Sequence, residues 1–320
     1  MTPADTGPSP SPSAFTVCVV PTVQGVRDGS VNQLTLQGIK AAAARVLIEQ
    51  PASPTDYVTD LQACVATTPA AIVAVSAAEA DAVAQVAGKS PASRFLLVDA
   101  QPVGASGQPL GLSNLISLVF DEKDAGYLAG ALAGLMENQK VGAATRNGTA
   151  ILGLDHSAPV DHYIAGYVAG ARAVDPQIAI KLAYSDSADP DFCRQLGRDQ
   201  VTAGADILFE VQDRCAAGYI DAAYRAGVYA IGSETDRAAL SPAVITSAVK
   251  RIDQVVAQLV AEVQRGSFHA GVRSFGLAND GTGYSTPSSV VPQDIINRVE
   301  DLRARIISGA VTPPDTVPPL

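Results

Sequence analysis

Long apolar runs and clusters of basic residues are both missing from this 320-residue sequence. Hydrophobic residues make up 47% of the chain, yet its apolar runs stay below the roughly 18 residues that suggest a membrane-spanning helix. The run at residues 125–136 instead predicts a buried helix with a small-residue face for close packing. The 22 Lys and Arg residues are outnumbered by 32 Asp and Glu, for a net charge of −10. Nucleic acids and anionic membrane surfaces are therefore not expected partners.

The familiar motifs of catalysis are also missing. The sequence has no phosphate-binding loop, no dinucleotide-binding glycine motif and no nucleophile elbow, and its cysteine spacing matches no zinc site. Its three histidines are His156, His162 and His269. The first two lie near an expected strand end and helix start, where a metal ion or a general base is conceivable, but a hydrogen-bonded neutral imidazole is the commoner role. We expect no metal, no cofactor and no catalytic residue.

The first 14 residues have neither the basic nor the apolar region of a secretory signal. Their proline and serine content predicts a disordered spacer. Such a spacer suits an exported domain or lipoprotein whose leader has been removed, and it equally suits an expression artefact.

Strand-like and helix-like segments alternate along both halves of the chain, which is typical of a parallel, doubly wound α/β sheet. The length favours two such lobes. Strands are expected at residues 15–21, 45–50, 71–76, 94–99, 113–120, 149–155, 178–184, 204–211, 228–231, 244–247 and 272–278. The expected divisions are a spacer at 1–14, a first lobe at 15–121 plus 242–268, and a second lobe at 122–241 plus 269–320, with a ligand cleft between the lobes. Several chain crossings predict a hinge, formed by segments near residues 120–124, 240–249 and 268–272.

The four cysteines, Cys18, Cys64, Cys193 and Cys215, allow three sets of disulfide pairs. In a strand order 2-1-3, the helix carrying Cys64 crosses over the strand carrying Cys18. Cys193 and Cys215 are expected at the same edge of the second sheet. We predict the bonds 18–64 and 193–215, which indicate an oxidising compartment; buried free thiols are the alternative.

A burst of polar residues follows a buried strand in the stretch 226–253. The strand at 228–231 is expected to stop at Gly232, and Glu234 follows directly. Ligands of open α/β sheets bind outside the carboxyl ends of strands. Lys250 comes after the next strand, so we expect Glu234 and Lys250 to face one cleft and to anchor a ligand. Two solvated surface loops are the alternative.

Six segments together resemble one known family. They are GVRDGSVNQLTLQG, VFDEKDAGYLAGALAG, YIAGYVAGARAVDP, AIGSETDR, ITSAVKRID and IISGAVTPP, in order along the chain from residue 25 to residue 314. Their pattern is similar to that of the basic membrane protein (BMP) family, the substrate-binding lipoproteins of ABC importers that include purine nucleoside receptors.

The resemblance implies a type I periplasmic-binding-protein fold, with two doubly wound parallel-sheet lobes joined by a multi-crossing hinge. It implies a non-catalytic receptor that captures a small polar solute, a nucleoside first, by hinge closure and delivers it to an ABC permease. A monomer is expected outside the cytoplasm, periplasmic or at the cell surface, with a lipid anchor on a removed N-terminal leader. The expected ligand-binding residues are Ser30, Asn32, Ser76, Asp155, Tyr163, Gln212, Asp213, Gly232, Glu234 and Lys250.

Departures from the family pattern concern the ligand. The aromatic residue that precedes N-Q in the family is Val31 here, and the aromatic expected after the third strand is replaced, with Ala78 among the residues there. Stacking on such a residue contributes roughly 1 to 3 kcal/mol per base. Tyr163 and Tyr184 are the candidate substitutes. A sugar, another heterocycle or an amide-rich metabolite is therefore the alternative ligand, a ligand sensor is an alternative role, and an enzyme is less favoured.

Overall fold

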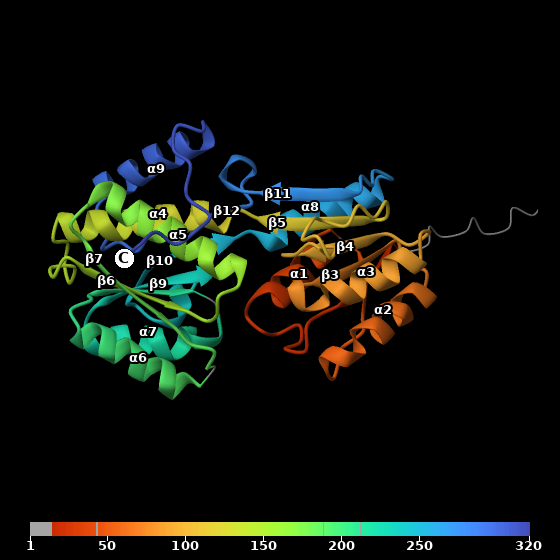
Figure 1. Cartoon of the computed structure of the whole chain (residues 1–320), viewed down its shortest axis with the longest axis horizontal. Coiled ribbons are helices and arrows are strands. Elements are labelled where there is room, and N and C mark those ends of the chain that lie inside the picture. Colours follow the sequence, from red (N-terminus) through yellow and green to blue (C-terminus); the bar gives the residue numbers. More distant parts are fainter. Residues whose placement is uncertain (1–14, 43, 188, 212) are drawn as a thin grey trace, which may run out of the picture. The chain divides into compact units, whose positions relative to one another are not determined.

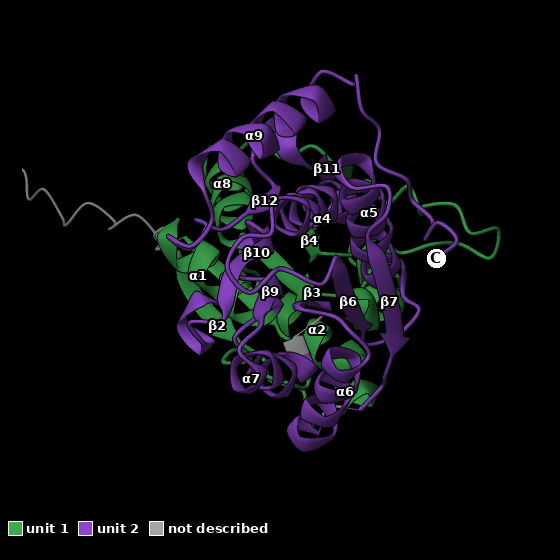
Figure 2. Cartoon of the chain, turned by 90° about the vertical axis from the view of Figure 1, so that its left-hand side faces the viewer, with its two compact units in different colours: residues 1–28, 32–118, 253–273 green, residues 29–31, 119–252, 274–320 purple. Residues whose placement is uncertain are grey.

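The computed structural model describes residues 15–42, 44–187, 189–211 and 213–320 (Figure 1). The expected spacer at 1–14 and the expected ligand residue Gln212 lie outside the described residues, as does the side chain of Asp213. The described chain forms two units (Figure 2). Unit 1 contains the described residues up to Asp28, Asn32–Leu118 and Asp253–Arg273, and unit 2 contains Gly29–Val31, Val119–Ile252 and Ser274–Leu320.

The first sheet has the strand order β11-β5-β4-β3-β1-β2, and its neighbours from β2 to β5 are parallel. All five residues of its central strand β3 are buried, and α2 and α3 cover the face of the sheet that carries Ile72 and Ala74. The strands are β1 (Thr16–Val20), β2 (Arg45–Ile48), β3 (Ala71–Val75), β4 (Phe95–Val98), β5 (Leu115–Phe120) and β11 (Gly271–Phe275). The helices are α1 (Val31–Ala41), α2 (Tyr57–Ala66), α3 (Ala80–Lys89) and α8 (Ile252–Gln264).

The second sheet, in unit 2, has the order β12-β10-β9-β8-β6-β7. Helices cover both faces: α4 and α5 lie on one, and α6 and α7 on the other (Figure 1). The strands are β6 (Gly148–Gly153), β7 (Ala179–Tyr184), β8 (Ile207–Val211), β9 (Tyr229–Glu234), β10 (Val244–Lys250) and β12 (Thr282–Tyr284). The helices are α4 (Glu122–Asn138), α5 (Ala158–Val174), α6 (Pro190–Thr202), α7 (Ala216–Ala226) and α9 (Gln293–Ile307). Two mostly parallel, doubly wound sheets confirm the predicted fold class.

Three details differ from the sequence-based assignment. The expected first-lobe segment 242–268 is divided in the structure, because β10 pairs in parallel with β9 and therefore lies in unit 2. The strand expected to stop before Gly232 continues to Glu234. A strand that was not expected, β12, pairs antiparallel with β10.

Both predicted disulfide bonds are present. Cys18 in β1 is bonded to Cys64 in α2, and Cys193 in α6 is bonded to Cys215 at the start of α7. The observed order β2-β1-β3 places α2 across β1, which is the relationship that the first pairing required. No free cysteine remains among these four residues.

The small-residue helix is packed as its sequence predicted. A Cβ atom added to Gly130 of α4 would lie 2.0 Å from the carbonyl oxygen of Tyr167 in α5, and one added to Gly170 would lie 2.0 Å from that of Tyr127. Glycine is therefore required where the two backbones meet. Within the described residues, we find no helix whose length and apolar character would let it span a membrane.

Candidate functional site

Glu234 and Lys250 end neighbouring strands of the second sheet. The residue before Lys250, Val249, lies opposite Glu234 in the parallel register of β9 and β10. The Nζ of Lys250 is 3.0 Å from Oε2 of Glu234, and both side chains are buried. Glu234 has a left-handed backbone, with φ of 66°, which is uncommon for a residue with a side chain. The structure thus brings together, at the carboxyl ends of two parallel strands, the two residues that were expected to face one cleft.

Glu122 joins this pair, although the sequence analysis did not select it. It is the first residue of α4, is 3% exposed, and its Oε1 is 3.5 Å from Nζ of Lys250. Its other oxygen, Oε2, is 3.4 Å from Nδ1 of His162. The hydrogen bond to Glu122 raises the pKa of His162, although burial acts in the opposite direction. The only sequence signal for Glu122 was an acid in the first turn of a largely apolar helix.

Aromatic rings surround the ammonium group of Lys250. Its Nζ lies 5.9 Å from the ring centres of Phe120 and Tyr163, within the range of a cation–π interaction. Tyr163 is fully buried. It was expected to contact the ligand, but its ring packs beside the lysine and offers no exposed face for stacking.

Gly232 leaves room for another buried cation. A Cβ atom at this position would lie 2.4 Å from Cγ of Arg237. The Arg237 side chain is buried, its Nε donates to the carbonyl oxygen of Ser233, and its backbone N–H donates to Oγ of Ser247. Arg237 was part of the predicted polar burst, but the sequence did not distinguish it from a solvated residue.

In unit 1, the side chain of Asn32 stabilises the loop that leads into α1. Its Oδ1 accepts from the backbone N–H of Thr22 at 2.9 Å, and its Nδ2 donates to Oγ1 of Thr22 and to Oδ2 of Asp28, both at 2.7 Å. Asp28 also accepts from the backbone N–H of Gln33 and so caps α1. Asn32 therefore positions the loop at the carboxyl end of β1.

The remaining expected residues lie on different segments. Ser76 follows β3 with a left-handed φ of 71°, and its hydroxyl accepts from the backbone N–H of Ala78. Asp155 is exposed after β6 and accepts from the backbone N–H of Ser157. Ser30 is buried in the short segment of unit 2 that precedes α1.

A second aromatic group lies at the carboxyl ends of β6 and β7. The rings of His156 and Tyr184 have centres 3.8 Å apart, and the Tyr184 hydroxyl donates to Oδ1 of Asp161 at 2.6 Å. Among the residues that the structure describes, no group of three or more His, Cys, Asp or Glu side chains could hold a metal ion.

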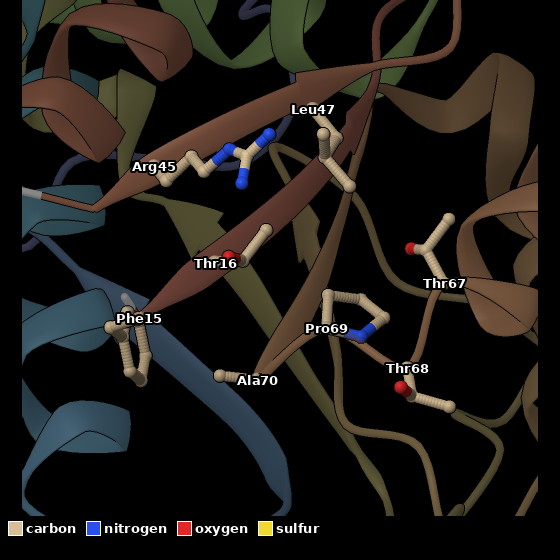
Figure 3. A pocket seen from close by; sticks show the side chains of 8 residues that line it. All are labelled: Phe15, Thr16, Arg45, Leu47, Thr67, Thr68, Pro69 and Ala70. Atoms are coloured by element: carbon tan, nitrogen blue, oxygen red, sulfur yellow. The ribbon is translucent and has the colours of Figure 1, made fainter. Parts of the chain in front are cut away.

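One hollow lies away from the carboxyl ends of the strands. A space of about 490 Å³ in unit 1 is lined at the amino ends of β1, β2 and β3 (Figure 3). Its side chains include Arg45, Thr16 and Pro69, and it contains none of the expected ligand residues. Because ligands of parallel α/β sheets bind at the carboxyl ends of strands, the Glu234–Lys250 pair is the better candidate.

Known proteins resemble the chain along nearly its whole length. The family model "Bmp: ABC transporter substrate-binding protein PnrA-like" matches residues 15–316. A CD4+ T-cell-stimulating antigen of Listeria innocua is 26% identical, covering 97% of this chain and 90% of that protein. The ABC transporter nucleoside-binding protein BmpA of Lactococcus lactis is 22% identical, covering 92% and 88%. The crystal structure of an ABC transporter solute-binding protein from Aeropyrum pernix superposes with a TM-score of 0.80 at 22% identity, covering 94% of each chain.

The family match covers both sheets, both disulfide bonds and the buried pair at the ends of β9 and β10. The two disulfide bonds also agree with a location outside the cytoplasm. The chain therefore belongs to the Bmp/PnrA-like family, and is an extracytoplasmic, non-enzymatic solute-binding protein that works with an ABC transporter.

Proposed function

We propose that the solute is a nucleoside, held by Glu234 and Lys250 and delivered to an ABC permease. The observation that carries the proposal is the buried ion pair at the carboxyl ends of β9 and β10. The name of the Lactococcus lactis relative, a nucleoside-binding protein, supports the same solute class.

The chemistry of the pair suits vicinal hydroxyl groups. A carboxylate accepts hydrogen bonds from hydroxyls and an ammonium group donates to them, so the pair can bind both hydroxyls of a ribose. Hydrogen bonds to charged groups contribute roughly 1.5 to 3 kcal/mol each. Because the side chains are already buried and paired in the described structure, little ordering is needed when the solute binds.

A sugar or another polyol is the second candidate. Val31 and Ala78 occupy the positions where the family's pattern has aromatic residues, and Tyr163 is buried, so base stacking at these positions is lost. This loss favours a solute recognised mainly through hydroxyl groups.

Capture by closure of the two units is part of the proposal. It is supported by the chain itself, which passes between the units after Leu118, Ile252 and Arg273. We further propose a monomer that is held at the membrane by a lipid. Small-angle scattering with and without a saturating solute should show a smaller radius of gyration in the bound state, and an unchanged radius would argue against closure.

A thermal-shift panel of nucleosides, bases, sugars and amino acids tests the solute class, on protein that has been unfolded and refolded to remove bound ligand. Nucleosides should raise the melting temperature most, and Glu234→Gln should remove most of that rise. A panel in which nothing binds, or in which only amino acids bind, would refute the proposal.

A further inference from the structure

The rings of His156 and Tyr184 lie against each other within unit 2, just beyond or at the carboxyl ends of β6 and β7. Their centres are 3.8 Å apart, and the angle between the ring planes is 33°. The His156 side chain is nevertheless 72% exposed, so most of the imidazole surface faces solvent. We call these two residues the aromatic platform. It offers an exposed ring at the edge where ligands of parallel α/β sheets bind.

Tyr184 is held in position by its neighbours. Its hydroxyl donates to Oδ1 of Asp161 at 2.6 Å, and the same oxygen lies 3.7 Å from Nδ1 of His156. A Cβ atom added to Gly153, the last residue of β6, would lie 2.8 Å from two carbon atoms of the Tyr184 ring. Glycine therefore makes room for this ring beside the end of β6. The imidazole thus has a fixed support before any solute binds, which lowers the cost of binding.

The aromatic platform and the Glu234–Lys250 pair lie at the same edge of the second sheet. In the strand order β10-β9-β8-β6-β7, two spacings of about 4.8 Å separate β9 from β6. Gly153 lies opposite Val211 in the parallel register, so β6 and β8 end together. The ends of β9 and β6 are therefore about 10 Å apart, which is close to the length of a nucleoside. One solute can contact the ion pair with its sugar and the platform with its base.

We propose that His156 stacks on the base of the nucleoside and that Tyr184 positions the His156 ring. The inference rests on the proposed function, because it names the residues that contact one part of the same solute. Bases stack on aromatic side chains, histidine included, and every base has a flat face that can do so. The platform supplies the stacking contact that is missing at Val31 and Ala78.

Calorimetry with the nucleoside that raises the melting temperature most tests the proposal. His156→Ala should weaken its binding about ten- to a hundredfold, the range expected when one stacking contact is lost. His156→Phe keeps a flat ring and should bind within about threefold of the wild type. His269→Ala, a matched change in an exposed histidine of unit 1, should have no effect.

A further variant tests the positioning role of Tyr184. Tyr184→Leu removes the ring that supports His156, so it should weaken binding as His156→Ala does. The double variant should lose no more affinity than either single variant, because both changes remove the same stacking contact.

Ultraviolet absorbance separates stacking from a merely structural role of His156. Stacking lowers the absorbance of a base, and the protein has no tryptophan that would obscure the change. Binding to the wild type and to His156→Phe should lower the absorbance of the nucleoside, and His156→Ala at saturation should remove most of this decrease. The melting temperature of His156→Ala without solute should equal that of the wild type, because the side chain is largely exposed.

The outcomes distinguish this inference from the proposed function. If a nucleoside binds and His156→Ala keeps wild-type affinity, or if His156→Phe loses as much affinity as His156→Ala, the proposed function stands and the inference is overturned. An absorbance decrease that persists in full in His156→Ala also overturns the inference alone. If no nucleoside in the panel binds, both are overturned.

Discussion

The buried carboxyl groups of Glu137 and Asp206 lie side by side in unit 2, and Oε1 of Glu137 and Oδ1 of Asp206 bond no other group among the described residues. Backbone N–H groups occupy their outer oxygens: Asn147 donates to Glu137, and Thr145 and Arg146 donate to Asp206. A hydrogen bond between two carboxyl groups needs a proton, so one of the pair is neutral. The pair therefore ties the end of α4 to the residue that precedes β8 by holding a proton.

This pair predicts a loss of stability at higher pH. Burial and the neighbouring Asp206 raise the pKa of Glu137 from its usual 4.5 to about 9. A pKa that is raised on folding contributes stability that is complete below the unfolded value and is lost as the pH rises through the folded value, here between about 4.5 and about 9. Each proton retained by the native state lowers the free energy of unfolding by about 1.4 kcal/mol per pH unit in this window.

Urea denaturation at several pH values between about 6 and 8 measures this slope. Asp206→Asn is the matched change, because the amide can accept from the same backbone groups and donate to an ionised Glu137. In this variant the free energy of unfolding should fall less steeply with pH than in the wild type, by the amount that corresponds to one proton, about 1.4 kcal/mol per pH unit. Glu79 in unit 1, fully buried and with its pKa raised to about 9 by burial, should contribute separately, and Glu79→Gln tests it. If the free energy of unfolding falls equally steeply with pH in the wild type and in both variants, Glu137 and Glu79 do not hold the retained protons.

The two members of the ligand pair should differ in their effect on stability. Removing Glu234 leaves Lys250 balanced by Glu122, so Glu234→Gln should change the free energy of unfolding by less than about 1 kcal/mol. Removing Lys250 leaves two buried carboxylates together, so Lys250→Met should cost about 3 to 5 kcal/mol.

Both single changes should weaken solute binding by about one to two decades, and the double variant should lose less than the sum. Calorimetry on the four proteins gives the affinities, and denaturation without solute gives the stabilities. Wild-type affinity in both single variants would remove the pair from the site.

The two disulfide bonds should contribute unequally to the free energy of unfolding. In the chain-entropy model a bond that spans 46 residues, as between Cys18 and Cys64, stabilises by about 4 kcal/mol, and one that spans 22, as between Cys193 and Cys215, by about 3 kcal/mol. Thiol titration of unreduced, denatured protein should find no free thiol, and paired Cys→Ala variants should lose these amounts. A measurable thiol in fresh protein would show that a bond is missing.

The close approach of α4 and α5 predicts opposite effects for two glycine substitutions. Gly130→Ala would put a Cβ atom 2.0 Å from a backbone oxygen, which must move α5, and should cost about 1 to 3 kcal/mol or more. Gly88→Ala, in the last turn of α3, meets nothing within 4 Å and should be neutral or stabilise by up to about 1 kcal/mol. If thermal unfolding ranks the two variants alike, backbone contact does not explain the glycine at position 130.

The repeating pattern of the sequence was sufficient for the fold because most strands are short, apolar and followed by a helix. Strands β1 and β3 and the disulfide between β1 and α2 all follow from that pattern. The strand β12 escaped prediction because its three residues, Thr282–Tyr284, follow a glycine-rich turn and pair with β10, which is distant in the sequence. Long-range pairing of this kind leaves no local signal.

The site could be predicted only in part, because the sequence does not show which side chains contact one another. A polar residue after a strand marks the correct edge of the sheet, as for Glu234, but the sequence does not reveal which polar atoms are already bonded within the fold. Asn32 was expected to contact solute, whereas its amide bonds Thr22 and Asp28. Glu122 reaches Lys250 across 128 positions of sequence, a separation that no spacing rule covers.

Because Glu234 has a left-handed backbone, the residue that would be most stable at this position is not the residue that would bind the solute. Glycine adopts this conformation without strain. Replacing Glu234 with glycine would remove the carboxylate, but Lys250 would remain paired with Glu122. Directed evolution for thermal tolerance alone should therefore enrich glycine at position 234 and yield a receptor that survives heating but no longer captures its cargo. A selection for improved variants of this protein therefore needs to test solute transport as well as thermal stability.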